Sequence, residues 1–414
     1  MKPTQGARLR GEATHSNGTN NIRHAYVKYG DVVKELDEFK FNSSKVPAGG
    51  PNAFLFEYLA EIAAQPLLLI SASTRNAHSQ SGNIEAHVFR GTSQLHPHGT
   101  AVVRMVAFFK ILFHLVKFRP NRILCGTLGF ALWACYIYAR AFSLPLVHSL
   151  HCRIDYDASP WYKRPTTYLD KFVLKHLSRV TCHGPFLRQQ LLDIGVKASA
   201  IAEYDCGFRD MWEQLESRQE INDLTEQRNY KTITFLGRME YTKGLFDLLY
   251  ACTDRLAEDA TLRLVYVGDG PDLLALKNKV TDLGLERQVL FLGRLPHEEL
   301  AGIICQSYLV ATPTQSIFPE GRCMATMEGL AMKIPVIAPN FGPFPYLVQH
   351  GVNGLLFSPD SIDDLRSQIN AALDDPALYA RLRDGALETS KKLLDPPVTF
   401  YKAVEWAFAN YVKV

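Results

Sequence analysis

Apolar runs with the composition of buried strands alternate with helical patterns along most of the 414-residue chain. Such alternation is typical of parallel sheets with helices on both faces. The series occurs twice, and a polar, charged stretch from Phe208 to Tyr230 separates the two copies. The predicted fold class is therefore α/β, with two doubly wound (Rossmann-like) domains facing each other across a cleft. The expected strands are 66–73, 122–127, 145–151 and 179–184 in the first series, and 231–237, 262–270, 288–295, 307–314 and 334–340 in the second.

The polar stretch is the predicted domain boundary. A chain of this length exceeds one ordinary core, so two domains of roughly 200 residues each are expected. The start of the chain is rich in Gly, Asn, Thr and Arg and predicts a loose tail. The predicted division is a tail over 1–23, an N-terminal domain over 24–208, a linker over 209–230, a C-terminal domain over 231–396 and a C-terminal helix over 397–414.

The composition is that of an ordinary globular protein. Hydrophobic residues make up 47% and charged residues 21%, and the net charge of +3 is too small to indicate nucleic-acid binding. The eight cysteines form no C-x-x-C pair and no zinc-finger spacing, so reduced thiols in a cytosolic protein are expected. The first residues have no apolar core, and we therefore expect no signal peptide and a cytoplasmic location.

Two apolar stretches raise the question of a membrane. Ile123–Leu150 contains Gly, Arg, Pro and His and ends in a β-rich run, so strand, helix, strand is expected in place of a membrane span. The helix predicted over Thr100–Phe118 carries basic residues among large apolar ones. Core packing with a solvated basic edge is the default interpretation, and peripheral contact with the inner face of a membrane is the alternative that stays open.

Two carboxylates, Glu320 and Glu328, lie between a strand that ends near Ala311 and a helix that starts near Cys323. The first is on the loop and the second is in the helix, so they can contact two parts of one elongated ligand. The helix N-terminus offers unpaired N–H groups to a phosphate or sugar oxygen. Gly321 would let the backbone approach a ligand closely, where a side chain would obstruct it.

This order of Glu, seven residues, Glu, a short helix, an apolar strand and a Gly-rich turn resembles the E-x7-E signature of glycosyltransferase family 4, whose members have the GT-B fold. FLGRMEYTKG (235–244) resembles the family's Gly-Arg and Lys-Gly element, and VGDGPD and FLGRL follow in the expected order. The resemblance covers about 231–384 well. The N-terminal half matches in outline, with a Gly-Gly turn, a strand ending in His151, and IAEYDCG (201–207) where such enzymes usually carry Asn-Gly.

The resemblance implies catalytic roles for Glu320, which would hydrogen-bond a hydroxyl of the donor sugar, and for His151, which would face the reacting centre from the other domain. Glu328 would bind the ribose, and Gly49 and Gly50 would open a loop near the donor phosphate and the acceptor. Arginine stands at position 322 where the family favours an apolar residue, so the donor sugar is not specified. The implied nucleotide-sugar-binding set also includes Arg238 and Lys243 at the diphosphate, the Gly321 and Arg322 backbone, and Arg294 in the FLGRL segment.

The C-terminal segment Pro397–Val414 carries Phe400, Tyr401, Trp406, Phe408 and Tyr411. That is too much apolar area for a free tail. The family resemblance also implies a crossover at this point. We therefore expect the final helix to pack back on the N-terminal domain.

The expected chemistry needs no metal and no cofactor. A nucleoside diphosphate leaving group gains negative charge as the glycosidic bond breaks, and fixed Arg and Lys cations can stabilise that charge. Asp155-Tyr156-Asp157 copies the D-x-D metal motif of the other large glycosyltransferase fold. Nothing else of that fold appears in the sequence, so a surface loop is expected there.

The predicted function is retaining transfer of a hexose from a nucleoside diphosphate sugar, expected to be UDP-linked, to an acceptor hydroxyl, as in polysaccharide or glycoconjugate biosynthesis. The acceptor is a saccharide, a lipid-linked saccharide or a small molecule, which the sequence does not separate. Two alternatives stay open. One is a GT-B-fold nucleotide-sugar epimerase or hydrolase, and the other is a non-catalytic sugar-nucleotide-binding scaffold.

Overall fold

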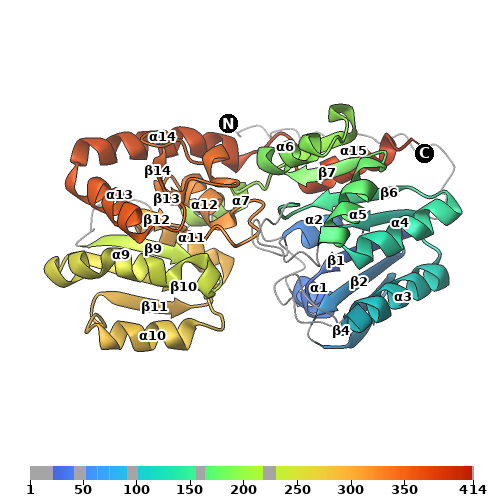
Figure 1. Cartoon of the computed structure of the whole chain (residues 1–414), viewed down its shortest axis with the longest axis horizontal. Coiled ribbons are helices and arrows are strands. Elements are labelled where there is room, and N and C mark those ends of the chain that lie inside the picture. Colours follow the sequence, from blue (N-terminus) through green and yellow to red (C-terminus); the bar gives the residue numbers. More distant parts are fainter. Residues whose placement is uncertain are drawn as a thin grey trace, which may run out of the picture.

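The computed structural model describes residues 22–41, 53–62, 64–73, 75–90, 101–154, 164–217 and 230–412. Two α/β domains, each with a central sheet between helices, lie side by side along the long axis of the molecule (Figure 1). The predicted fold class of two doubly wound domains is therefore confirmed.

The described part of the N-terminal sheet has eight strands in the order β3-β4-β2-β1-β5-β6-β7-β8. Neighbouring strands are parallel apart from the antiparallel hairpin of β3 and β4. The order reverses at β1, which pairs with β2 on one side and β5 on the other, and ligands bind at such switch points. The bounds are β1 (His24–Tyr29), β2 (Leu67–Ser73), β3 (Ala77–Ser81), β4 (Ile84–Arg90), β5 (Arg122–Cys125), β6 (Leu146–Leu150), β7 (Val180–His183) and β8 (Ile201–Tyr204).

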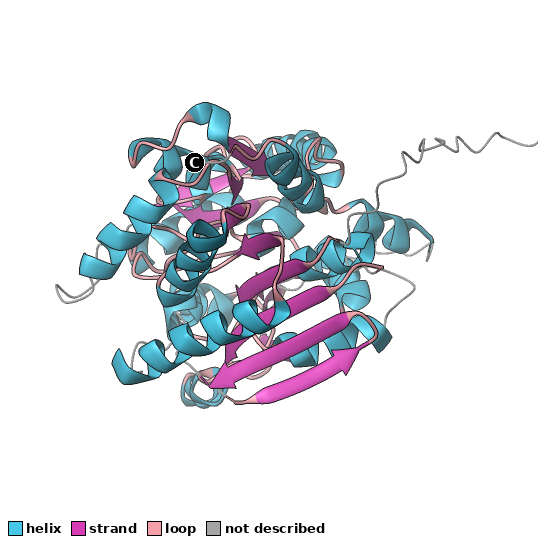
Figure 2. Cartoon of the chain, turned by 90° about the vertical axis from the view of Figure 1, so that its right-hand side faces the viewer, coloured by secondary structure: helices cyan, strands magenta, loops and turns pink. Residues whose placement is uncertain are grey.

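Helices cover both faces of this sheet (Figure 2), because its central strands direct apolar side chains to both sides. One face packs against α3, α4, α5 and α6. The other packs against α1, α2 and the C-terminal helix α15. The bounds are α1 (Val32–Phe41), α2 (Ala53–Ile62), α3 (Ala101–Phe118), α4 (Phe130–Phe142), α5 (Arg164–Lys175), α6 (Pro185–Asp193) and a 3-10 turn η2 (Ala198–Ala200).

The C-terminal sheet, all of it within the described residues, has six parallel strands in the order β11-β10-β9-β12-β13-β14. Its switch point lies between β9 and β12. The strands are β9 (Lys231–Leu236), β10 (Leu262–Val267), β11 (Val289–Gly293), β12 (Leu309–Ala311), β13 (Val336–Pro339) and β14 (Gly354–Phe357). The helices and turns are η3 (Tyr241–Lys243), α9 (Leu245–Glu258), α10 (Leu273–Asp282), α11 (His297–Gln306), α12 (Met324–Ala331), η4 (Phe344–Tyr346), α13 (Ile362–Asp374) and α14 (Pro376–Leu394).

The chain crosses between the domains twice. α7 (Arg209–Ser217) opens the segment predicted as a linker, and its Met211 and Trp212 are buried in the C-terminal core. Residues 218–229 lie outside the described residues. After α14 the chain returns, and α15 (Phe400–Ala409) packs against α2, β6, β7 and β8 of the N-terminal domain (Figure 1). At both crossings, a helix of the crossing segment is therefore packed into the core of the domain that the chain enters.

The apolar stretch Ile123–Leu150 forms β5, α4 and β6, as predicted. In the described part of the chain, no helix is both long and apolar enough to span a membrane. The cysteines, all of which lie in that part, are free thiols, as expected.

Candidate active site

Loops from the carboxyl ends of strands in both sheets meet between the domains. His151 directly follows β6, and Gly321 lies in the loop between β12 and α12. A Cβ atom added to Gly321 would lie 2.3 Å from the carbonyl oxygen of His151 and 2.9 Å from the Cα of Cys152. Gly321 thus makes room for the backbone of the other domain, and its predicted place beside the donor stays a prediction.

Lys243 and Glu320 form an ion pair at the switch point of the C-terminal sheet. The Nζ of Lys243 lies 2.5 Å from Oε2 of Glu320 and 3.8 Å from the ring centroid of Phe318. Both side chains are largely shielded from solvent, with exposures of 19% and 11%. Gly244 has a φ of 73°, and a Cβ atom there would collide with the Pro313 carbonyl. Glycine at 244 thus lets the turn that carries Lys243 approach the loop that leads to Glu320.

Arg238 and Arg294, the other cations predicted for this site, have different surroundings. Arg238 follows β9 directly, and its Nε lies 3.3 Å from Oε2 of Glu240 while 44% of its side chain stays exposed. Arg238 and Lys243 thus lie close together in sequence after the same strand, each beside a carboxylate. Arg294 follows the edge strand β11, two strand positions from β9, and is exposed. Its assignment to the nucleotide-sugar site remains a prediction.

Glu328 is buried within α12, with 5% of its surface exposed. Burial raises the pKa of Glu328 to about 7, so a substantial fraction of this carboxyl is protonated in neutral solution. Hydroxyl groups that donate hydrogen bonds favour the ionised form of a carboxyl group. A ribose diol is such a donor, and the environment of Glu328 suits the role predicted for it.

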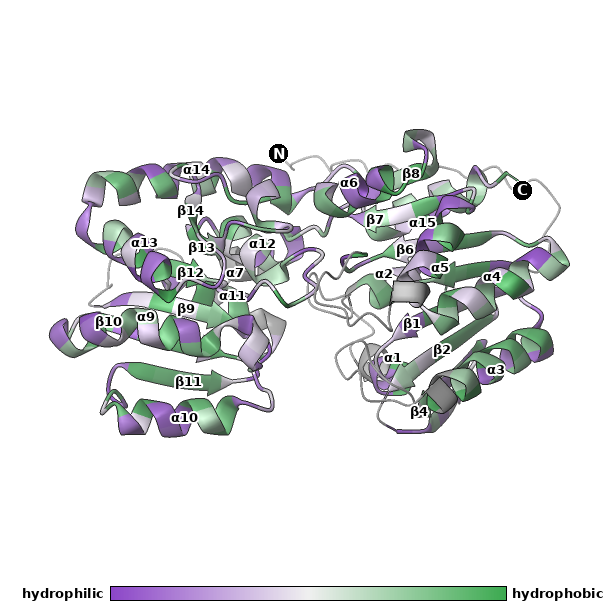
Figure 3. Ribbon diagram, viewed as in Figure 1, coloured by the Kyte–Doolittle hydropathy of each residue, from purple (hydrophilic) through white to green (hydrophobic). Residues whose placement is uncertain are grey.

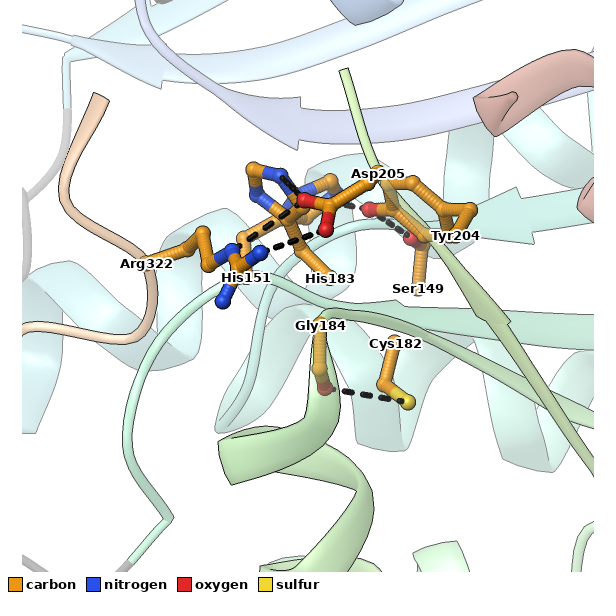
Figure 4. Close-up of polar contacts among 8 residues, drawn as sticks. All are labelled: Ser149, His151, Cys182, His183, Gly184, Tyr204, Asp205 and Arg322. Carbon is orange, nitrogen blue, oxygen red and sulfur yellow. Dashed lines mark hydrogen bonds and ion pairs between the residues drawn. The ribbon is translucent and has the colours of Figure 1, made fainter. Parts of the chain in front are cut away.

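The hydroxyl groups of Tyr204 and Ser149 form a hydrogen-bonded chain that ends at the His151 ring (Figure 4). The Tyr204 hydroxyl lies 3.1 Å from Nδ1 of His151, and Oγ of Ser149 lies 3.0 Å from that hydroxyl. Burial lowers the pKa of His151 well below its usual range, and the charges of His183 and His148 act in the same direction. The imidazole is therefore neutral at pH 7, and its Nε2 stays available to a ligand.

Arg322 joins the two domains through a carboxylate of the N-terminal domain. Its Nη2 and Nε lie 2.5 Å and 3.1 Å from the two carboxylate oxygens of Asp205, which follows β8 (Figure 4). His183, at the end of β7, places Nε2 3.2 Å from the same carboxylate. The Arg322 side chain is 4% exposed and that of Asp205 is 23% exposed, so the guanidinium of this fork-shaped pair is largely shielded from water. We name Arg322, Asp205 and His183 the interdomain clamp.

The charge state of the clamp follows from its environment. Burial alone would raise the pKa of Asp205, but the contacts with His183 and Arg322 outweigh burial and hold that pKa below its usual value. Burial lowers the pKa of His183, which is therefore neutral at pH 7. The clamp thus pairs one arginine charge with one carboxylate charge. Nη1 of Arg322 is buried and has no hydrogen-bond partner among the described residues, so it is the donor left for a ligand.

Sequence reasoning missed several residues of this site, because they come from strands and helices distant in sequence. The ring of Phe54 on α2 lies 5.0 Å, between centroids, from the rings of His151, His183 and Phe400. The signal for one missed residue was present in the segment 201–207, where Asp205 stands in place of the family's usual Asn-Gly. The predicted positions Gly49, Gly50, Asp155 and Asp157 lie outside the described residues.

Comparison with known proteins identifies the family. A model described as glycosyl transferases group 1 matches residues 216–389, and one described as Glycosyltransferase Family 4 matches residues 48–206. The chain belongs to the group 1 glycosyltransferase family. Over 68% of its length this glycosyltransferase is 22% identical to the sulfoquinovosyl transferase of Arabidopsis thaliana, and over 48% it is 27% identical to the alpha-monoglucosyldiacylglycerol synthase of Streptococcus pneumoniae. These matches cover 56% and 47% of the two relatives, so the glycosyltransferase spans about half their length.

Solved structures agree on the fold. The Anabaena protein HepE in complex with UDP and glucose matches with a TM-score of 0.63 at 18% identity, covering 94% of this chain and 97% of that one. The sucrose-phosphate synthase of Thermosynechococcus elongatus matches with a TM-score of 0.67 at 17% identity, covering 93% and 97%. The glycosyltransferase thus has the GT-B fold that its sequence predicted.

Proposed function

We propose that this glycosyltransferase moves a sugar from a UDP-sugar to an acceptor hydroxyl with retained configuration and without a metal ion. The observation that carries the proposal is the Lys243–Glu320 pair, which lies on the loops that flank the Gly321–His151 contact between the domains. A cation and a carboxylate are thereby available beside the place where the two domains touch. Binding of an anionic diphosphate would draw the Lys243 ammonium to the phosphates and free Glu320 to accept hydrogen bonds from sugar hydroxyls.

Retention is supported by the state of His151. An inverting transfer needs a general base on the side of the sugar opposite the leaving group. The lowered pKa of His151 makes its imidazole a weak base, better suited to donate a hydrogen bond to the sugar. In a retaining transfer the acceptor approaches on the face of the departing phosphate, and a phosphate oxygen can take the acceptor's proton.

A UDP-linked donor is supported by the fold neighbour that was solved with UDP and glucose. The absence of a metal requirement is supported by Arg238 and Lys243, which offer two positive charges after the same strand. These cations can offset the charge that grows on the diphosphate during bond cleavage.

The test first measures the binding of a panel of nucleotides and sugar donors, and then the turnover of each donor. We expect UDP to raise the melting temperature, and one UDP-hexose to release UDP quickly when acceptor is present, at 25 °C and in excess EDTA. Conversion of the donor without acceptor would favour the epimerase alternative, and lack of any turnover would favour the scaffold. Activity lost with EDTA and restored by Mn²⁺ or Mg²⁺ would refute metal independence.

We further propose that the acceptor is reached at a membrane surface. α3 lies on the outside of the N-terminal domain and is largely apolar (Figure 3). Its exposed side chains recur at helical spacing, and α4 and α5 add further exposed aromatic and aliphatic groups beside it. We name this surface the α3–α5 face; its large apolar residues, each at least 41% exposed, are Met105, Val106, Phe109, Phe113, Val116, Ile137, Phe142, Tyr168, Leu169 and Phe172.

The charges on the α3–α5 face favour an anionic lipid surface over a protein partner. Lys110, Lys117, Arg140 and Lys175 are exposed on these described helices. Asp170 is the one acidic residue in the sequences of α3, α4 and α5, and it is buried. It accepts hydrogen bonds from the Gly129 backbone and the Trp133 indole, inside the domain. Apolar groups bordered by cations and without exposed acids match the interface of an anionic bilayer.

We expect the protein to sediment with vesicles that contain phosphatidylglycerol and to do so weakly with phosphatidylcholine alone. A Phe109→Glu/Phe113→Glu variant should lose this binding, because both side chains are more than 60% exposed and each carboxylate opposes insertion. Leu274→Glu, which alters an equally exposed apolar residue on α10, is the matched control. A lipid-free dimer that the double variant abolishes would show that a second copy of the chain covers this face instead.

A further inference from the structure

Three imidazoles and a carboxylate gather at the outer edge of the N-terminal sheet. His78 on β3 and His87 on β4 are register partners across the hairpin. Glu85 lies two residues before His87, so both side chains point to the same face of β4. The His114 ring, on α3, lies against that of His87, with the two centroids 3.9 Å apart. Three separate elements thus direct metal-binding side chains to one place.

The distances within this cluster are short. One donor atom from each of His78, Glu85 and His87 lies within 4.8 Å of the other two. Nε2 of His87 is 2.7 Å from Oε1 of Glu85. The ring centroid of His87 is 4.5 Å from that of His78 and 3.9 Å from that of His114. His87 is buried and His78 is exposed, so an ion can enter from solvent.

We propose that this cluster binds a divalent transition-metal ion, of which Zn²⁺ is the best match. Zinc takes imidazole nitrogens and carboxylate oxygens in tetrahedral geometry, with ligand atoms about 3.3 Å apart. Side-chain rotation would have to bring the donors of His78, Glu85 and His87 from within 4.8 Å to that spacing, and the His114 ring lies against that of His87. Imidazole-rich sites favour zinc over magnesium or calcium, which prefer oxygen ligands.

The role of the ion would be structural. β2, β1 and β5 lie between β4 and β6 in the sheet, so the cluster is far from His151. Bound zinc would join the β3–β4 hairpin at the sheet edge to α3. The Lys117 charge acts on Glu85 and opposes a cation, and the Glu85 carboxylate offsets this repulsion.

The test uses the full chain after treatment with EDTA and removal of the chelator. We expect calorimetric titration with ZnCl₂ to show one bound equivalent, and zinc to raise the melting temperature. The His78→Gln and His87→Gln variants should each lose that equivalent and the thermal shift. His176→Gln is the control, because His176 directly follows α5 and contacts the Phe172 carbonyl.

Because His78 is exposed, its replacement leaves the core intact, so the test holds even if the His87→Gln variant folds poorly. Wild-type protein that binds no zinc would overturn the proposal. So would a His78→Gln variant that binds zinc with unchanged stoichiometry and affinity. Both readouts are independent of glycosyl transfer, so they do not depend on the proposed function.

Discussion

Replacing Glu320 by glutamine is expected to lower sugar transfer roughly 100- to 1,000-fold, as the loss of one preorganised charge-stabilising group typically does. The carboxylate lies 2.5 Å from Lys243 and is 11% exposed, so its position is fixed before the donor arrives. Glutamine keeps the size of the side chain and removes the charge. Turnover should fall far more than UDP affinity, because Glu320 is proposed to contact the reacting sugar and not the nucleotide.

The measurement is kcat and KM for the donor, with UDP affinity by calorimetry. Glu388→Gln is the matched control, because Glu388 also pairs with a lysine, Lys391 at 2.6 Å, on the exposed surface of α14. That variant should keep wild-type turnover. A Glu320→Gln enzyme with half of the wild-type kcat would show that the assignment of Glu320 is wrong.

Replacing Asp205 by asparagine is expected to reduce the free energy of unfolding by about 3 kcal/mol, the lower end of the cost of leaving a buried charge without its partner. The Arg322 guanidinium is 4% exposed and could not regain water without separating the domains. The two guanidinium nitrogens that contact the carboxylate of Asp205 would then face one neutral amide oxygen in place of two charged carboxylate oxygens. The contacts of the interdomain clamp should therefore break before the domains themselves unfold. The domains of the variant should separate at a lower denaturant concentration than those of the wild type.

The measurement is urea unfolding of Asp205→Asn, Arg322→Leu and the double variant. Removing both charges should restore much of the loss, because no unpaired buried charge remains. Asp395→Asn is the control, since Asp395 pairs with Arg209 in the same fork-like manner but both side chains are about half exposed. It should cost far less than Asp205→Asn, because ion pairs in water contribute little to stability. Strictly additive losses in the double variant would contradict the clamp.

Most of the strands that the sequence predicted are buried on both faces, and the edge strand β11 is the exception. Each apolar run expected as a strand contains one in the structure, because a parallel strand between two layers of helices needs apolar side chains on both sides. The strands that it missed are β1, β3, β4, β8 and β14, whose sequences are short or have polar residues between the apolar ones. β3 reads Ala-His-Ser-Gln-Ser, since an edge strand is half solvated, and β1 follows a polar tail.

The candidate site likewise contains residues that the sequence could predict and residues that it could not. Lys243 and Glu320 could be predicted, because a motif within one domain fixes both and the structure places them in contact. Their roles in transfer remain predictions. His183 and Phe54 could not be predicted as site residues, because each reaches the site from a different element of the N-terminal domain. The one sequence signal for Asp205 was the departure of segment 201–207 from the family's usual Asn-Gly.

By itself the sequence determined two doubly wound domains, a family and the residues that the motif carries, since local patterns record the burial and turns of their own element. The tertiary structure decided which residues meet across the domain boundary. It paired Arg322 with Asp205 and set Gly321 against the His151 backbone. These contacts depend on how two folded surfaces dock, and that geometry has no periodic signal along the chain.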